Sequence, residues 1–222
     1  MGPCILQSLA SVPTISDIYR VAILLGRIVT YYNQPQSIGQ SKKTSDDLTS
    51  LENILSLFEF ALSRSPLSLQ ALHPAAATTT LWLHTLVQTC SILLFHPQVT
   101  SSISSAENTT RSLLKTSALE KCGASVQRML QKFRATEHCP FVLKNPFLLN
   151  ACYLGSHLLV IISRSKCSSR QSEIQFLLDV MESISTHGYT LAQKFIYEIR
   201  QDAERDEDEV RKIRTGRGYY LE

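Results

Sequence analysis

The stretch from Leu81 to Pro97, LWLHTLVQTCSILLFHP, constrains the fold more than any other part of the chain, because it is a long apolar run with a helical period. It contains the single tryptophan, Trp82. Apolar residues recur at helical spacing, so one broad stripe is predicted to face a core: Leu83, Leu86, Val87, Cys90, Leu93 and Leu94. We predict a central helix that begins just after Pro74 and ends at His96, because Pro97 disfavours a helical conformation in the residue before it.

The same period recurs on both sides of this stretch. It predicts a first helix capped by Ser16 and Asp17, and a second capped by Ser45. Further helices are predicted over about 113–135, 147–161, 174–186 and 191–200, with a break at His187 and Gly188. No strand-like alternation and no repeat of 20 to 50 residues is present. We therefore predict an all-α fold, an irregular bundle of about seven helices without a sheet.

Two of these helices have well-defined inward faces. The helix over 113–135 is expected to bury Ala118, Cys122, Val126, Met129, Leu130 and Phe133. The helix over 174–186 is expected to bury Ile174, Leu177, Leu178, Met181 and Ile184. After Gln201 the apolar period disappears. We predict one domain over residues 1–200 and a charged tail over 201–222 that is partly helical or disordered.

Composition and charge exclude several classes of protein. Hydrophobic residues make up 44% and charged residues 18% of the chain, which excludes wholesale disorder. The 22 basic and 19 acidic residues give a net charge of only +3, too little for a domain that wraps nucleic acid by itself. A basic stripe of Lys121, Arg128 and Lys132 lacks interleaved aromatic residues, so a solvated face is favoured over a nucleic-acid site.

Cysteine and histidine spacing indicates no metal site. The six cysteines include no Cys-x-x-Cys pair, and we expect ordinary reduced cysteines, with Cys90 and Cys152 in the core. The six histidines include no pair at i,i+3 or i,i+4 that would bind one ion from one helix face. No cofactor is expected in this chain.

Motifs for catalysis and for membrane insertion are also lacking. Gly155-Ser156-His157 lacks the spacing of a nucleophile elbow and is predicted to be a helix interior. No glycine-rich phosphate loop is present, so an enzyme is not expected; a site assembled from distant residues is the enzymatic alternative. The opening residues lack a secretory signal, and the apolar runs 82–95 and 147–162 are shorter than the roughly 20 residues that a bilayer requires.

Four polar residues on apolar helices are candidates for contact with an effector or a partner. Arg20 and Arg27 are seven residues apart and share one side of the first helix. His84 and His96 lie near the two ends of the central helix. For the arginines the structural alternative is a solvated face or a salt bridge, and for the histidines it is a hydrogen-bonded place at the edge of the core.

Four segments in order resemble the regulatory region of fungal zinc-cluster transcription factors, known as the middle homology region or fungal-specific transcription factor domain. The first is AILLGRIVTYY (Ala22 to Tyr32), and the second is the central stretch with its leucine-histidine start and histidine-proline end. The third is KCGASVQRMLQKF (Lys121 to Phe133), and the fourth is NPFLLNACYLGSHLLV (Asn145 to Val160). The order and spacing agree over residues 16–200.

The resemblance implies an all-helical module that regulates RNA polymerase II transcription in the nucleus, by sensing a small effector or by partner interaction. Its partners would be zinc-cluster regulators, as a homodimer or heterodimer, and the transcription machinery. The family's six-cysteine DNA reader has no counterpart here, so no direct DNA binding is expected, and zinc would enter only with such an N-terminal cluster. The match covers the C-terminal half of the family's region, as expected of a truncated product, a fragment or a paralogue that dimerises with or inhibits a full-length factor.

Overall fold

The computed structural model describes residues 14–33, 41–63, 74–100, 109–137, 140–166 and 170–214. These residues are almost entirely helical and contain no β-strand. A short helix, α6 (Pro140–Leu143), and a 3-10 turn, η2 (Pro146–Leu148), precede α7. The seven long helices are α2 (Ile15–Asn33), α3 (Ser41–Ser63), α4 (Pro74–Thr100), α5 (Thr109–Arg134), α7 (Leu149–Lys166), α8 (Gln171–Ser185) and α9 (Thr190–Arg214). The predicted all-α fold is confirmed.

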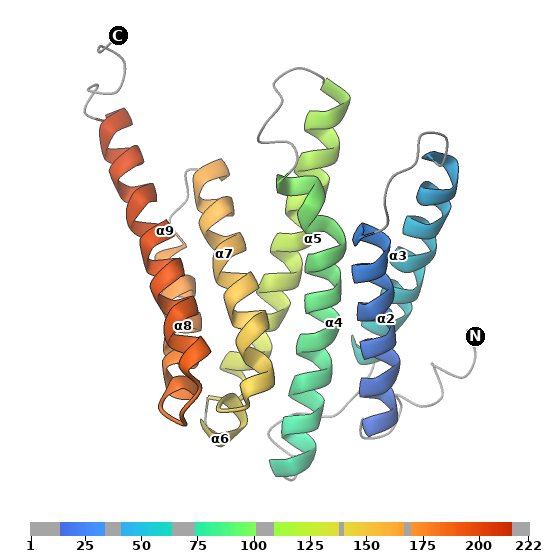
Figure 1. Ribbon diagram of the computed structural model, residues 1–222, viewed down its shortest axis with the longest axis horizontal. Helices are drawn as coiled ribbons and strands as arrows, with labels where there is room; N and C mark the ends of the chain where they lie inside the picture. The colour runs from blue at the N-terminus through green and yellow to red at the C-terminus, as the bar shows by residue number, and fades with distance from the viewer. Residues whose placement is uncertain are drawn as a thin grey trace. The chain divides into compact units, whose positions relative to one another are not determined.

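The chain divides into two compact units, Met1–Val142 and Leu143–Glu222. In the first unit α4 contacts α2, α3 and α5, and its most extensive packing is against α5 (Figure 1). In the second unit α7, α8 and α9 all pack against one another, and η2 packs against α7. The last helix, α9, continues through residue 200 to Arg214.

The central helix α4 is covered on nearly every side. From Leu81 to Phe95 every side chain is buried or partly buried, because α2, α3 and α5 approach it from different directions. Cys90, Ile92 and Leu94 are fully inaccessible. Ile92 lies outside the predicted stripe, so that single stripe understates the burial of this helix, while Leu86 and Leu93, within the stripe, are only partly buried.

The helix α4 also continues past its predicted end at His96, through Pro97 to Thr100. A proline inside a helix removes one N–H donor, which leaves the carbonyl four residues earlier without its usual partner. In the same turn the hydroxyl of Tyr32 on α2 donates a hydrogen bond to the backbone carbonyl of Leu94. The carbonyl that loses its helical donor is that of Leu93, and the Tyr32 bond ties the neighbouring carbonyl of Leu94 to α2; the helix thus continues through Pro97 although the residue before proline disfavours a helical conformation.

Two helix starts also differ from the prediction. The helix α2 begins at Ile15, and the Asp17 carboxylate accepts hydrogen bonds from the backbone N of Thr14 at 2.9 Å and from its Oγ1 at 2.8 Å. Asp17, which is only 1% exposed, therefore reaches back to Thr14 and satisfies its N–H and hydroxyl, while the Asp17 N–H donates to the Thr14 backbone carbonyl at 3.0 Å; Ser16 is exposed within the first turn. The helix α3 begins at Ser41, four residues before the predicted cap at Ser45.

The predicted inward faces of α5 and α8 are confirmed, since every residue named for them is buried. The outer helices α2 and α9 agree less well with the predicted pattern of burial. Val29 on α2 is 45% exposed and Leu191 on α9 is 49% exposed, although both continue an apolar period. A helix on the edge of a unit carries some apolar residues outside its contact face. Periodicity alone does not distinguish these exposed apolar residues from the buried ones.

In the second unit, the predicted break after α8 is confirmed at Gly188, which has a φ of 90°. The stretch Pro146–Arg164 meets the length and composition expected of a membrane-spanning helix. The prediction that the apolar run here is too short to cross a bilayer was therefore wrong. Slightly over half of that window, 56%, is buried inside the protein, as in the core helix of a soluble protein, and such a helix is weak evidence for a membrane.

Candidate functional site

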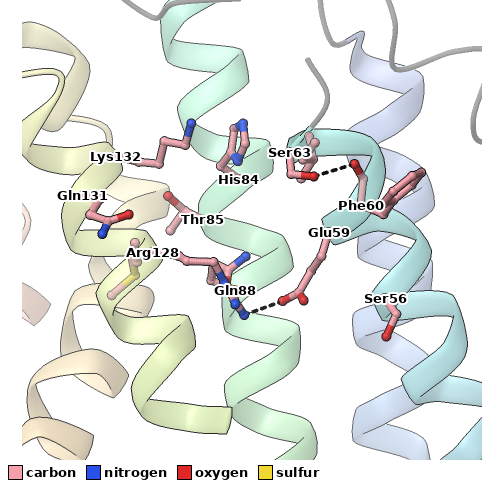
Figure 2. A pocket seen from close by; sticks show the side chains of 12 residues that line it. Ser56, Glu59, Phe60, Ser63, His84, Thr85, Gln88, Arg128, Gln131 and Lys132 are labelled. Carbon is pink, nitrogen blue, oxygen red and sulfur yellow. Dashed lines mark hydrogen bonds and ion pairs between the residues drawn. The ribbon is translucent and has the colours of Figure 1, made fainter. Parts of the chain in front are cut away.

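A cleft of about 520 Å³ opens in the first unit between α3, α4 and α5 (Figure 2). Its charged groups are Glu59 from α3 and Arg128 and Lys132 from α5, while α4 supplies His84 and Gln88. Leu62 and Met129 provide buried apolar surface, and the remaining lining residues are Ser56, Phe60, Ser63, Thr85 and Gln131. The cleft therefore combines polar groups that converge from three helices with a partly apolar wall, as small-molecule sites do.

Arg128 is the structural centre of this cleft. Its guanidinium lies 2.9 Å from the Glu59 carboxylate on α3 and donates through Nε to the side-chain oxygen of Gln88 on α4 at 3.0 Å. It also donates to Ser125 Oγ at 3.2 Å. One residue of α5 thus links all three helices, and its charge is largely offset by Glu59.

A second ion pair lies one heptad earlier on the same two helices. Lys121 on α5 is 3.5 Å from Glu52 on α3, and its ammonium lies 4.3 Å from the ring centroid of Phe95 on α4. Because Glu52 and Glu59 are seven residues apart on α3, as Lys121 and Arg128 are on α5, both pairs fall on facing sides of the helices. Two of the three residues in the basic stripe predicted on α5, Lys121 and Arg128, therefore form ion pairs with α3.

Polar groups also lie in the packed surface between α4 and α5. Ser125 on α5 donates to Ser91 Oγ on α4 at 2.8 Å, and both residues are buried. Buried hydroxyls are seldom left without partners, because an unmade hydrogen bond is unfavourable in a low-dielectric interior. This bond fixes the register of α5 on α4 next to Arg128.

His84 and Lys132 form the opposite end of the cleft, where Figure 2 shows their side chains next to each other. Burial, followed by the positive charge of Lys132, lowers the pKa of His84 from its ordinary 6.5 to about 4. The imidazole is therefore neutral at pH 7. Within the part of the chain that the structure describes, neither the His84 ring nor the Lys132 ammonium has a hydrogen-bonding or ion-pair partner.

No protein-family model matches this chain. The curated proteins and the solved structures also give no match. Its function must therefore be inferred from the residues of the cleft and from the order of its motifs.

Of the four residues predicted as contact candidates, the structure places only His84 in this cleft. Arg20 lies on α2, 3.4 Å from the buried carboxylate of Asp17, so it stabilises the first turn of its own helix. Arg27 is exposed and lines a separate groove of about 370 Å³ with Asp47. His96 lies about three turns beyond His84 on α4, is partly buried, and is not among the residues that line the described clefts.

Three of the cysteines lie in the described chain, and all three are buried free thiols: Cys90, Cys122 and Cys152. Burial raises the pKa of Cys90 and of Cys122 to about 12, and that of Cys152 further still, so each remains protonated at neutral pH. The prediction of core cysteines is confirmed for these residues. Cys4, Cys139 and Cys167 lie outside the described residues.

Other predicted features can be placed as well. Gly155, Ser156 and His157 lie inside α7, so the predicted helix interior is confirmed. Across the described ranges no group of three or more His, Cys, Asp or Glu side chains is arranged to hold a metal ion.

Sequence reasoning missed Glu59 and did not connect Arg128 and Lys132 with His84. The available signal was the matching seven-residue spacing of two acidic residues on one helix and two basic residues on another. That spacing indicates one charged face on each helix but does not show that the two helices are neighbours. The cleft depends on that tertiary arrangement.

Proposed function

We propose that this chain is a non-catalytic regulatory module of RNA polymerase II transcription that acts in the nucleus and responds to a small effector. The observation that carries the proposal is the cleft between α3, α4 and α5, where His84 and Lys132 face the open space. A molecule bound there would contact three helices at once. It would favour one packing of α3 on the other two, which is how a ligand shifts a conformational equilibrium.

The order of the motifs supports the same proposal. The segment Ala22 to Tyr32 lies on α2, Leu81 to Pro97 on α4, and Lys121 to Phe133 on α5. Asn145 to Val160 covers all of η2 with its cap Asn145 and most of α7. These segments resemble the regulatory region of fungal zinc-cluster factors, in which DNA is read by a separate zinc cluster. We therefore assign to this chain regulation without DNA binding of its own, with zinc-cluster regulators and the transcription machinery as partners.

A tethered reporter assay tests this function. The whole chain is fused to an unrelated DNA-binding domain in a fungal host, and a reporter with the matching binding site is measured. We expect reporter output to change at least about threefold relative to the DNA-binding domain alone, and Lys132→Gln to alter that response. Lys194→Gln is the matched control, because Lys194 is an exposed lysine on α9 whose ion pair with the partly exposed Glu198 is long, at 3.9 Å. A reporter that does not respond to the fused chain would contradict the proposal.

A stand-alone interaction module is the alternative function, and the outer face of α2 favours it. Ile15, Tyr19 and Ile23 follow one another at four-residue spacing and are 71%, 67% and 64% exposed. Adjacent exposed apolar residues on one helix face mark protein contact sites more often than isolated ones do. In this alternative the chain dimerises through α2 with a full-length zinc-cluster factor and inhibits it.

Substitution on this face distinguishes the two functions. Ile23→Asp should abolish capture of a zinc-cluster factor in a pull-down if α2 is the contact surface, and should leave reporter output unchanged if the cleft is the responsive element. Leu191→Asp on α9 is the control, since it places the same charge on an exposed apolar residue of the second unit. Retained capture by the Ile23→Asp variant would exclude α2 as the interface.

A further inference from the structure

We propose that the cleft between α3, α4 and α5 binds a small organic monocarboxylate, with its carboxylate on Lys132 and His84 and its apolar body on Leu62 and Met129. This inference rests on the proposed function, because it names the chemical class of the effector. The first observation is the pair of side chains, Lys132 and His84, at the end of the cleft away from Glu59. The Lys132 ammonium and the His84 imidazole both face the cleft, and neither has a partner among the described residues.

The balance of charge in the cleft indicates a single negative charge on the ligand. Arg128 is held by Glu59 at 2.9 Å and by Gln88 at 3.0 Å, and Glu59 is the only carboxylate among the described residues that line the cleft. These two charges offset each other, and Lys132 remains as the uncompensated cation. A neutral His84 adds no further charge, but its ring N–H is a donor that suits a carboxylate oxygen.

The same balance argues against anions of higher charge. A phosphate monoester or a dicarboxylate would bring a second negative charge, and among the described residues that line the cleft the one further cation is Arg128, which is already engaged with Glu59. Phosphate sites in proteins usually add backbone N–H groups from a glycine-rich loop or a helix N-terminus. The cleft is instead lined by the middle turns and C-terminal turns of its helices, where backbone N–H groups are already bonded within each helix.

The wall next to these polar groups is apolar. Leu62 on α3 and Met129 on α5 are buried below the cleft, and the ring of Phe60 on α3 is 50% exposed beside it. A compact aromatic or branched body would cover this surface while its carboxylate reached Lys132. Because Phe60 and Leu62 belong to α3, whereas Lys132 and His84 belong to α5 and α4, such a ligand would stabilise the contact of α3 with the other two helices.

Binding of benzoate to the purified full chain tests the inference, with benzamide as a neutral molecule of the same shape and benzylamine as a cation. Calorimetry gives the affinities, and the NMR signal of the His84 ring, assigned with His84→Gln, reports the site. We expect benzoate to bind about fivefold more tightly than benzamide, which is the size of one partly exposed ion pair, and benzylamine to bind least. The His84 signal should shift with benzoate at saturation.

Two variants at opposite ends of the cleft should change the affinity for benzoate in opposite directions. Lys132→Gln should remove the preference for benzoate over benzamide. Glu59→Gln should strengthen benzoate binding by about twofold to threefold, because it removes the repelling carboxylate and leaves Arg128 free to approach the ligand. A general loss of structure would weaken binding in both variants, so the opposite signs separate charge recognition from misfolding. Lys194→Gln should bind benzoate as the unaltered chain does.

Equal affinity for benzoate and benzamide, an unchanged preference in Lys132→Gln, or no saturable binding of benzoate would each overturn the inference. The result is separable from that of the reporter assay. Charge-selective binding with an unresponsive reporter would leave the ligand class intact and remove the transcriptional role. A responsive reporter without benzoate binding would keep the transcriptional role and reject this ligand class.

Discussion

Arg128 on α5 and Glu59 on α3 form a 2.9 Å ion pair across the cleft, while the same guanidinium donates to Gln88 on α4 at 3.0 Å. The two contacts differ in environment. The side chains of Arg128 and Glu59 are 47% and 28% exposed, whereas Gln88 is only 5% exposed. Ion pairs near the surface contribute little to the stability of the fold, whereas a buried amide oxygen that loses its hydrogen-bond donor lowers that stability strongly.

We therefore predict unequal effects on stability at the two ends of this contact. Arg128→Met should lower the free energy of unfolding by about 2 kcal/mol, because Gln88 loses its donor, and Glu59→Gln by less than about 1 kcal/mol. Lys121→Met is the matched control on α5, because its ion pair with Glu52 has no buried amide attached, and it should also lose less than about 1 kcal/mol. Urea denaturation followed by the fluorescence of Trp82, in the same unit, measures each value. Equal losses in Arg128→Met and Lys121→Met would contradict this account of Gln88.

The buried His84 should make stability depend on pH below neutrality. Its pKa is about 4 in the folded chain and near 6.5 when unfolded, so the unfolded state takes up a proton first as the pH falls. The contribution of the neutral His84 to stability is then fully present above pH 6.5 and is lost progressively between pH 6.5 and pH 4. The loss should be about 2 kcal/mol, which is smaller than the full shift implies because the ring is not completely shielded from solvent.

The variant His84→Gln isolates this contribution, since it cannot take up the proton. Its free energy of unfolding should decline less steeply between pH 6.5 and pH 4 than that of the unaltered chain. The carboxylates common to both proteins cancel in the difference between the two curves. Parallel curves over this range would show that His84 is not protonated preferentially in the unfolded state.

The hydrogen bond from Tyr32 to the carbonyl of Leu94 makes a corresponding prediction at alkaline pH. Burial, with smaller effects from Tyr31, Cys122 and Glu52, raises the pKa of Tyr32 from 10.0 to about 12. Because the folded state holds this proton more tightly than the unfolded state, its stabilising effect is complete below pH 10 and is lost as the pH rises through 12. Tyr32→Phe should lower stability at pH 7 by about 1 kcal/mol and should flatten the decline above pH 10. Tyr19→Phe, at a 67% exposed position on the same helix, is the control for both effects, and equal behaviour of the two variants would exclude a structural role for the Tyr32 hydroxyl.

Much of the fold follows from the sequence because amphipathic helices repeat a pattern along the chain. Ile174, Leu177 and Met181 on α8 were predicted to be inward-facing from spacing alone, and all are buried. The pattern fails where burial is not one-sided. The helix α4 is covered from three directions, and Leu191 on α9 continues an apolar period although it is exposed.

The cleft is less predictable, because it depends on which helices are neighbours. His84 was identified from its residue type, since a histidine on an apolar helix is a candidate contact residue whatever surrounds it. Lys132 appeared only as part of a basic stripe, and Glu59 did not stand out at all. The end of α4 was also misplaced from a local rule: the helix continues through Pro97, and in this turn the Leu94 carbonyl is bonded by Tyr32, which lies 62 residues away along the chain.

Two glycines with equal room for a side chain should respond in opposite ways to substitution by alanine. A Cβ atom at Gly26 or at Gly188 would meet nothing within 4 Å, so neither substitution causes a clash. Gly26 lies in the middle of α2, where alanine loses less backbone entropy on folding, and Gly26→Ala should raise stability by about 0.5 to 1 kcal/mol. Gly188 has a φ of 90°, a conformation that a Cβ atom disfavours, and Gly188→Ala should lower stability by about 1 to 2 kcal/mol.

The two units require separate probes in this experiment. Trp82 fluorescence follows the first unit, which contains Gly26, and hydrogen exchange of backbone amides in α8 and α9 follows the second, which contains Gly188. Gly188→Asn supplies an internal check, because asparagine tolerates positive φ better than alanine and should lose less stability. If Gly188→Ala did not lower stability, the turn after α8 would not depend on positive φ, and Gly188 would be only one of several residues able to end that helix; a loss of stability in Gly26→Ala would contradict the prediction for α2.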